Sequence, residues 1–226
     1  MTDEMTIKIV KGGPYIVSGC VPISEKIVTP KGEGYVWTDG ENIEQKERYS
    51  LCRCGRSKNS PFCDGGHSKA LAFGGKEKAD RAPYEKRAKV LEGETLDLKD
   101  DGRCALARFC HTDRGKVWTL IKNSGDPECR ELAIRAACEC PAGRLTAYDK
   151  DGTLHEDVLD EEIVVIQDPE KGCSGGYYVK GGIKIVSAEG HEYEVRNRYV
   201  LCRCGHSRDM PFCDASHIGY RFKSKN

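Results

Sequence analysis

Two short stretches of the sequence carry the same metal-binding side chains at the same spacing. Each begins with a Cys-x-Cys-Gly segment and ends with a Pro-Phe-Cys-Asp segment and a histidine. The potential ligands are Cys52, Cys54, Cys63 and His67 in the first stretch, and Cys202, Cys204, Cys213 and His217 in the second. The second set follows the first by 150 positions throughout. Three cysteines and one histidine supply the number of ligands that a tetrahedral metal site takes.

The spacing of these ligands bears on which metal they hold. Thiolates favour zinc, copper(I) or iron–sulfur clusters, and imidazole suits zinc and iron. Zinc fingers usually separate paired cysteines by about two to four residues, whereas one residue separates Cys52 from Cys54. Such a pair can hold one iron of a 2Fe–2S cluster, with Cys63 and His67 on the other iron. Asp64 is placed to cap a short helix and fix the turn between them. The alternative is a structural zinc site that only fixes the conformation of a loop.

With these residues at this spacing, both stretches resemble the CDGSH iron–sulfur family, whose pattern is C-x-C-x2-[S/T]-x3-P-x-C-D-G-[S/A/T]-H. The sequence departs from the pattern at Gly66 and at Ala215, and neither change removes a potential ligand. The resemblance covers about residues 11–70 and 172–222. It implies one 2Fe–2S cluster at each site, held by the three cysteines and the histidine of that stretch. MitoNEET-like members are homodimers with one cluster per subunit, so two copies in one chain suggest an internal pseudo-dimer.

The segments that precede each site repeat as well. Apolar residues alternate between flanking glycines in 13–19 and again in 176–181, which predicts a strand in each copy. A second strand is expected at 21–23 and at 183–185. Matching strands then enter the two sites at 48–51 and 198–201. A core formed by one copy alone would give only marginal stability at this size. The two copies are therefore expected to pack face to face.

A segment of different character, residues 89–160, separates the two copies. It contains Cys104, Cys110 and a Cys140-Pro141 pair. Bacterial cluster ferredoxins use C-x2-C-x2-C with a distant Cys-Pro, and removing the middle cysteine leaves the arrangement seen here. The segment therefore resembles a divergent mono-cluster ferredoxin domain, which implies a 3Fe–4S cluster on these three cysteines.

Other interpretations of this segment remain open. Cys129 or Cys138 could supply a fourth ligand and convert the cluster to 4Fe–4S. The cysteines could instead be buried small hydrophobic residues in a fold that binds no cluster. Cys129 falls on a predicted helix, where a cysteine is more often part of the core than a ligand.

The middle segment also carries clear signals of secondary structure. Asp126 is expected as the N-cap of a helix with Pro127 at its first position. Strands are expected before it at 117–121 and after it at 144–148. The second of these strands continues into a hairpin through 149–152.

Smaller signals surround the sites. Arg53 and Arg203, inside the Cys-x-Cys pairs, are expected either to donate to cluster sulfides and raise the reduction potential or to point into solvent. Cys20 and Cys173 are expected as incidental thiols in glycine-rich turns. His206 is expected near the second cluster without binding it.

Composition limits the class of protein. Among 226 residues, 36 Lys and Arg balance 36 Asp and Glu, so charge does not point to nucleic acid or an anionic membrane. Thirteen cysteines could suggest a disulfide framework. The ligand spacing within the two repeated stretches and the lack of a signal peptide instead favour reduced thiols in the cytosol. Apolar runs are too short to span a membrane. The protein is expected to be cytoplasmic, soluble and monomeric.

Together these patterns predict an α+β fold of three units. Residues 1–88 form the first CDGSH unit, 89–160 the ferredoxin-like insert and 161–226 the second CDGSH unit. The sequence has no nucleophile–base pair, phosphate loop or dinucleotide fingerprint, so the chain is not expected to be an enzyme itself. Its expected function is electron transfer between two 2Fe–2S clusters, a possible third cluster and a redox partner protein. The alternative is storage of clusters, their transfer to an apo-acceptor, or redox sensing.

Overall fold

The protein is a mixed α+β structure. The computed structural model describes residues 4–44, 46–69 and 73–224, and within these ranges the chain forms four small sheets and a few short helices. The predicted α+β class is confirmed. Among the described helices, none is both long and apolar enough to cross a bilayer.

The sheet next to the first metal-binding stretch takes one of its strands from the far end of the chain. Its strand order is β14-β1-β2-β5. The bounds are β1 (Thr6–Ile9), β2 (Tyr15–Ser18), β5 (Tyr49–Leu51) and β14 (Lys184–Val186). Strands β1, β2 and β5 are antiparallel neighbours, and β14 adds to β1 in parallel. The predicted strands at the start and at the entry of the first site are confirmed.

The sheet next to the second stretch is built in the same way. Its order is β15-β13-β12-β3-β4. The bounds are β3 (Ile23–Lys31), β4 (Gly34–Asp39), β12 (Glu162–Asp168), β13 (Cys173–Lys180) and β15 (Arg198–Leu201). Here β3, from the N-terminal part, adds to β12 in parallel. Each sheet therefore contains a strand from the other copy, an exchange that supports the predicted pseudo-dimer.

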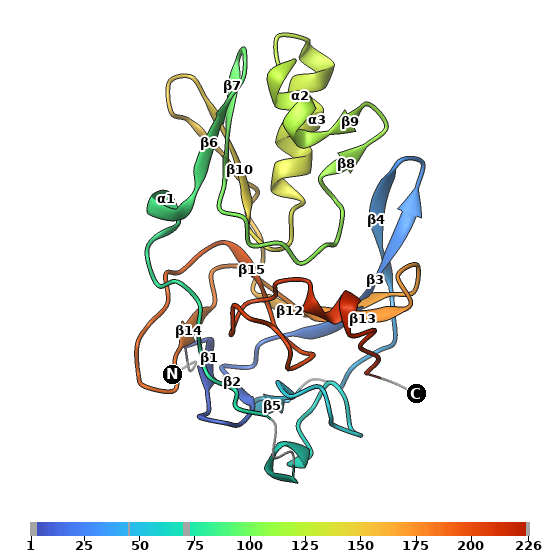
Figure 1. The fold of residues 1–226 in the computed structure, drawn as a ribbon, viewed down its shortest axis with the longest axis vertical. Coiled ribbons are helices and arrows are strands. Elements are labelled where there is room, and N and C mark those ends of the chain that lie inside the picture. The colour runs from blue at the N-terminus through green and yellow to red at the C-terminus, as the bar shows by residue number, and fades with distance from the viewer. Residues whose placement is uncertain (1–3, 45, 70–72, 225–226) are drawn as a thin grey trace.

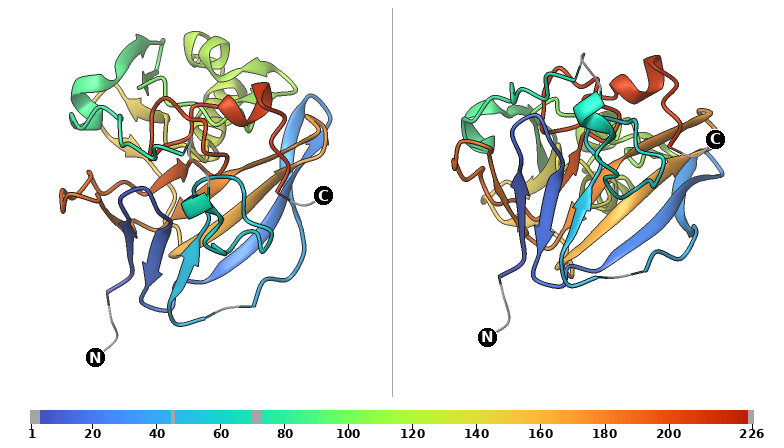
Figure 2. Two further views of the ribbon diagram at one scale, coloured as in Figure 1. Left: turned by 60° about the horizontal axis from the view of Figure 1, so that its bottom comes forward. Right: turned by 90° about the horizontal axis from the view of Figure 1, so that it is seen from below.

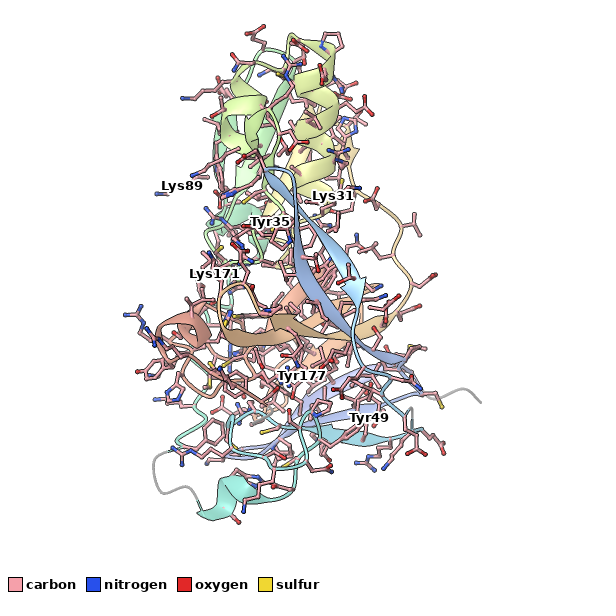
Figure 3. The ribbon with its side chains drawn as sticks, turned by 90° about the vertical axis from the view of Figure 1, so that its right-hand side faces the viewer. Lys31, Tyr35, Tyr49, Lys89, Lys171 and Tyr177 are labelled. Carbon is pink, nitrogen blue, oxygen red and sulfur yellow. The ribbon has the colours of Figure 1, made fainter. Side chains whose placement is uncertain are left out.

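One hydrophobic core lies between these two sheets. Alternate residues of each strand point inward, as a sheet with one buried face requires. The core residues from both copies include Ile7, Ile9, Tyr15 and Val17 together with Ile163, Val165, Tyr177 and Val179. Figure 3 labels Tyr177 where the strands of the two sheets come together. Because the apolar faces are shared, neither copy has a complete core of its own.

The β3–β4 hairpin extends beyond its sheet toward the middle segment. Figure 3 shows its tip, at Lys31, beside the helices of that segment. The amide of Glu33 donates to Asp113 Oδ1 at 2.8 Å, which ties the tip to the loop between β8 (His111–Thr112) and β9 (Gly115–Lys116). Trp37 on β4 stacks on Phe109, with ring centroids 4.5 Å apart. The hairpin thus joins the first copy to the middle segment.

The middle segment forms a sheet of order β11-β10-β7-β6 with helices packed against it. The bounds are α1 (Tyr84–Arg87), β6 (Lys89–Glu92), β7 (Leu96–Asp100), α2 (Val117–Lys122), α3 (Pro127–Cys138), β10 (Leu145–Asp149) and β11 (Leu154–His155). Asp126 caps α3 by accepting from the amides of Glu128 and Cys129. The predicted helix, the strand after it and the hairpin are confirmed. The likeness to a ferredoxin domain stays a prediction.

Two sequence predictions about local structure were wrong. The segment predicted as a strand at 117–121 is helix α2, in which Val117, Leu120 and Ile121 are buried. Their spacing of three and four residues places them on one helical face, and this spacing outweighed the β propensity of the segment. Cys173 does not lie in a turn, because it begins strand β13 and is buried.

The three parts of the molecule follow one another along its long axis. Figures 1 and 3 place the middle segment at one end and helix η1 (Gly66–Lys69) of the first site at the other. Helix α4 (Ser216–Gly219), which carries His217, lies between them. Figure 2 shows η1 and α4 from two other directions.

Candidate iron–sulfur centres

Strands β5 and β15 deliver the Cys-x-Cys pairs of the two sites. The Sγ atoms of Cys52 and Cys54 lie 3.7 Å apart, and those of Cys202 and Cys204 lie 3.7 Å apart as well. Two thiolates at about 2.3 Å from a tetrahedral metal ion stand about 3.8 Å apart. Each pair is therefore spaced to hold one metal ion.

The third cysteine and the histidine form a second pair at each site. The distance from Cys63 Sγ to His67 Nδ1 is 3.4 Å, and that from Cys213 Sγ to His217 Nδ1 is 3.4 Å. A thiolate at about 2.3 Å and an imidazole nitrogen at about 2.0 Å from a tetrahedral ion lie about 3.5 Å apart. This pair is also spaced for one ion, and Nδ1 is the nitrogen placed to bind it.

Aspartates fix the turns that hold these second pairs. Asp64 Oδ1 accepts from the amide of Gly66 at 2.9 Å, and Oδ2 accepts from the amide of Lys58 at 2.9 Å. Asp214 repeats this pattern with the amides of Ser216 and Arg208. The predicted capping role of Asp64 is confirmed.

The ligand pairs bear on whether each site suits a two-iron cluster or a single zinc ion. Among the described residues, no three His, Cys, Asp or Glu side chains converge as a mononuclear site would require. Each site instead presents two separate two-ligand pairs, as a 2Fe–2S unit needs, with two protein ligands on each iron. The residues present therefore fit a 2Fe–2S cluster, and they fit the alternative of a zinc staple poorly.

Hydrogen bonds within each site favour the thiolate form of one cysteine. The pKa of Cys52 is lowered to about 5, first by the hydrogen bond from Cys54 and then by backbone amides that point at its sulfur. The pKa of Cys202 is lowered to about 7 by the hydrogen bond from Cys204 and by amides in the same arrangement. The same hydrogen bonds raise the pKa of Cys54 and Cys204, so without a metal each pair favours one thiolate and one thiol.

Of the two roles expected for Arg53 and Arg203, the one in which they point into solvent was wrong. Both side chains are buried, so neither points into solvent. Arg53 donates from its three nitrogens to main-chain carbonyls, at 2.9 Å each: Val10, Gly13 and Gly75. Arg203 donates to Ser60 Oγ at 2.8 Å. Arg53 thus ties neighbouring loops to its site, whereas Arg203 Nε is buried without a hydrogen-bond partner among the described residues.

Each site is supported by a tyrosine from the other copy. The hydroxyl of Tyr15 donates to the carbonyls of Cys202 and Pro211, at 3.0 and 3.1 Å. The hydroxyl of Tyr177 donates to those of Cys52 and Pro61, at 2.9 and 3.0 Å. Sequence reasoning missed both tyrosines, although the matched glycine-flanked strands that contain them are a signal for such a role.

The two ligand loops also touch each other directly. A Cβ added to Gly55, whose φ is +73°, would lie 2.4 Å from the carbonyl oxygen of Cys204. A Cβ on Gly205, whose φ is +81°, would lie 2.6 Å from that of Cys54. The glycine after each Cys-x-Cys pair is therefore required by the close approach of the other loop as well as by its own backbone conformation.

The sites differ in how far their second pair is covered. Cys213 is 5% exposed and His217 is 3% exposed, whereas Cys63 and His67 are only half-buried. Burial lowers the pKa of His217 to about 4. His206 lies in the second ligand loop as expected: its amide donates to Cys204 Sγ at 3.5 Å.

The three cysteines predicted to hold a third cluster come together in the middle segment. Cys104, Cys110 and Cys140 line one small cavity. The amide of Leu106 donates to Cys104 Sγ at 3.3 Å, and the Arg144 guanidinium also bonds to that sulfur. Burial raises the pKa of Cys110 to about 11. Three thiols that line one cavity, with an amide donating to one of them, are the ligands that a 3Fe–4S cluster would need here.

Neither cysteine expected as a fourth ligand lines this cavity. Cys129 is buried in the core between α2, α3 and the sheet. Cys138 donates to the carbonyl of His155 at 3.6 Å. The cavity thus presents three cysteines, and neither of the two residues considered as a fourth ligand is placed among them.

Comparisons with known proteins place the two flanking stretches in one family. The sequence model of the family described as iron-binding zinc finger CDGSH type matches residues 12–68 and 174–218. Searches of curated proteins and of solved structures found no match. Both matched segments contain all four ligands of a site, and the family binds iron–sulfur clusters. Each of the two segments therefore matches the CDGSH-type iron-binding family, which is consistent with a tandem CDGSH-type protein.

Proposed function

We propose that this protein transfers single electrons by means of two 2Fe–2S clusters and a third cluster in the middle segment. One observation carries the two-cluster part of the proposal. At both sites the Cys–Cys sulfurs are 3.7 Å apart and the Cys–His pair is 3.4 Å apart, as two irons with two protein ligands each require. The clusters would be held by Cys52, Cys54, Cys63 and His67, and by Cys202, Cys204, Cys213 and His217.

Bound 2Fe–2S clusters supply reversible one-electron chemistry, and the residues of this chain tune it. Three thiolates and one neutral imidazole give each cluster less negative charge than four thiolates would. Its potential should therefore lie between the about −400 mV of all-cysteine ferredoxins and the about +300 mV that two-histidine centres reach. Buried apolar residues such as Leu51 and Leu201 exclude water from the Cys-x-Cys side.

The third cluster would be of the 3Fe–4S type on Cys104, Cys110 and Cys140. The shared cavity supports this assignment, because three thiolates suit a cluster that lacks one iron corner. With no enzymatic motif in the sequence, the chain would act as a monomeric carrier that exchanges electrons with a redox partner protein.

A second function, transfer of a cluster to an apo-acceptor protein, is favoured by the first site. Its Cys63 and His67 are half-buried, so an acceptor thiol could reach the iron that they would hold. The second site does not offer the same access, because Cys213 and His217 are almost fully covered.

Iron and acid-labile sulfide per chain, measured on anaerobically purified protein, test the proposal. Two 2Fe–2S clusters and a 3Fe–4S cluster give about seven iron and eight sulfide. About four of each would mean that the middle segment holds no cluster and would favour cluster transfer. Zinc without sulfide would refute the iron–sulfur proposal.

Replacing the histidine ligands by cysteine separates the two functions. If electron transfer is the function, His67→Cys and His217→Cys should keep their clusters and still cycle, at a lower potential, because a thiolate adds negative charge. If cluster transfer is the function, His67→Cys should abolish delivery to an apo-ferredoxin while His217→Cys changes it little. Redox titration and a transfer assay on the same preparations give both answers.

A further inference from the structure

The second CDGSH site lies against the middle cysteine loop. Cys213 belongs to the same buried hydrophobic cluster as Ala105, Ala107 and Phe109, which lie between Cys104 and Cys110. These contacts cover the side of the second site that carries Cys213. The corresponding cysteine of the first site, Cys63, is only half-buried.

The ligand sets of the two neighbouring sites also share one opening. Cys104 of the middle site and Cys213 of the second site line the same open pocket. On its wall Arg103 pairs with Asp209 at 3.3 Å. One ligand of each proposed cluster thus faces a common space, with no strand or helix between them.

A buried ion pair fixes the middle loop to the second half of the chain. Arg108, between Cys104 and Cys110, donates to both carboxylate oxygens of Asp168, at 2.7 and 3.0 Å. Both side chains are buried, and both lie close enough to His217 to act on its charge. A bidentate pair of this kind holds its partners in one geometry.

The second site also lies against the first, but on its other side. The ligand loops meet where Gly55 approaches Cys204 and Gly205 approaches Cys54. Along the long axis of the molecule, Figures 1 and 3 place the second site between the middle segment and the first site. No described hydrogen bond or ion pair joins residues 52–67 to the middle segment.

We propose that the second CDGSH site is the relay between the other two, so that electrons pass between the middle and first sites only through it. This inference rests on the proposed electron-transfer function and adds an order to it. Cys104, Cys110 and Cys140 would hold the group that supplies one electron, the second CDGSH site would hold the group that receives it, and the first site would hold the group to which it is passed on. No bond changes, and the net result is one electron passed from a one-electron donor protein to an acceptor protein at the half-buried first site.

The order predicts which clusters are magnetic neighbours. Microwave power saturation of EPR signals measures how fast each paramagnetic cluster relaxes, and a paramagnetic neighbour speeds this relaxation. Three variants each remove one cluster from the full chain: Cys54→Ser the first, Cys204→Ser the second and Cys110→Ser the middle one. Loss of the second cluster should slow relaxation of both others. Loss of the first or of the middle cluster should slow only the second.

A milder variant covers the case in which Cys204→Ser does not fold. In His217→Cys the second cluster is retained at a lower potential, so the sample can be poised with that cluster oxidised and diamagnetic. Relaxation enhancement at the oxidised, paramagnetic middle cluster should then be lost, and reducing the second cluster while the middle one stays oxidised should restore it. His67→Cys, treated in the same way, is the matched control and should leave the middle cluster unchanged.

Two results would overturn the inference in distinguishable ways. If relaxation of the middle cluster responds to the first site and not to the second, the order is wrong while the three-cluster function stands. If iron and sulfide analysis finds clusters at the two CDGSH sites alone, both the relay and the third cluster fail, and a two-cluster function remains.

Discussion

At the scale of single residues, the two sites share ligands but differ in their surroundings. His217 is 3% exposed, and its burial lowers the pKa of the imidazole to about 4. His67 occupies the same position in the repeat but is half-buried beside the loop that contains Gly13, with an added Gly13 Cβ 3.8 Å from its Nε2. Equal ligand sets therefore do not make equal sites.

This difference predicts two steps of cluster loss in acid. Protonated imidazole cannot bind iron, and water reaches His67 more easily than His217. As the pH falls, the first cluster should be lost at a higher pH than the second, as followed by EPR and visible absorption. His67→Cys should remove the early step and leave the later one. Loss of both clusters in one step would contradict the prediction.

The buried imidazole also makes the stability of the cluster-free chain depend on pH. In the unfolded chain a histidine titrates near pH about 6.5, whereas His217 in the folded chain stays neutral down to about pH 4. Between these values the unfolded state binds more protons, so the free energy of unfolding should fall as the pH falls through this window. Urea titrations of metal-free protein should show this fall, and His217→Gln should reduce it.

At the scale of elements, each site consists of a strand end, a ligand loop and a short helix turn. The close contact between loops is where a small change should be most damaging, because Gly55 and Gly205 each face a carbonyl of the other loop. By contrast, the turn after the third cysteine tolerates a side chain: Ala215 occupies it in the second site with φ +65°.

Gly55→Ala should therefore harm both sites, and Gly65→Ala should not. The new Cβ at position 55 meets the Cys204 carbonyl oxygen at 2.4 Å, whereas at position 65 it meets nothing within 4 Å. Both positions have positive φ, +73° and +80°, so backbone strain is matched. Gly55→Ala should lower the free energy of unfolding by about 1–3 kcal/mol more than Gly65→Ala does, because inserting an atom into a packed contact usually costs this much. Urea unfolding and iron content measure the difference between the two variants. If both variants lose the same stability and iron, the contact between the loops is not the cause.

The helix of the middle segment allows an independent test of its cap. Asp126 accepts from the amides of Glu128 and Cys129, at 2.8 and 3.2 Å. Asp126→Ala should lower the free energy of unfolding by about 1 kcal/mol, while Asp126→Ser should recover most of it. Iron content at the flanking sites should stay constant, because the cap lies in the middle segment.

At the scale of the whole molecule, the two CDGSH segments are interleaved. Strand β3 completes the sheet of the second segment, and β14 completes that of the first. Tyr15 and Tyr177 likewise each donate a hydrogen bond from their own segment to the ligand loop of the other segment. The two sites should therefore respond to changes in each other's segment.

Removing the hydroxyl of a tyrosine in one segment should change the metal site in the other segment. Tyr15→Phe leaves the buried carbonyl of Cys202 without its donor, and Tyr177→Phe does the same to Cys52. Each substitution should lower the free energy of unfolding by about 1–3 kcal/mol, because a buried carbonyl loses its hydrogen-bond donor. Tyr15→Phe should shift the EPR signal of the second cluster and Tyr177→Phe that of the first. Tyr49→Phe, which removes a buried hydroxyl bonded to Val21, is the control and should leave both signals in place.

The ligands themselves were predictable from the sequence because they depend on local spacing. Cys52, Cys54, Cys63 and His67 lie within one loop and a turn, and the aspartate that fixes the turn stands beside its ligand. The helix after Asp126 was predictable for the same reason, since a cap and a proline act within one turn. Helix α2 was not predictable, because its β-branched and aromatic residues favour a strand. Its helical form depends on the burial of one face against the rest of the middle segment.

What the tertiary structure alone decided is which segments meet. The sequence determined two metal-binding loops, their ligands and the strands that enter them, since these follow from side-chain chemistry and short-range patterns. It did not determine that β3 and β14 exchange sheets, that Tyr15 supports the second site, or that Arg108 locks the middle loop to Asp168. Those contacts join residues far apart in the chain. They form because two half-cores must bury their apolar faces together, and that requirement acts on the folded molecule as a whole.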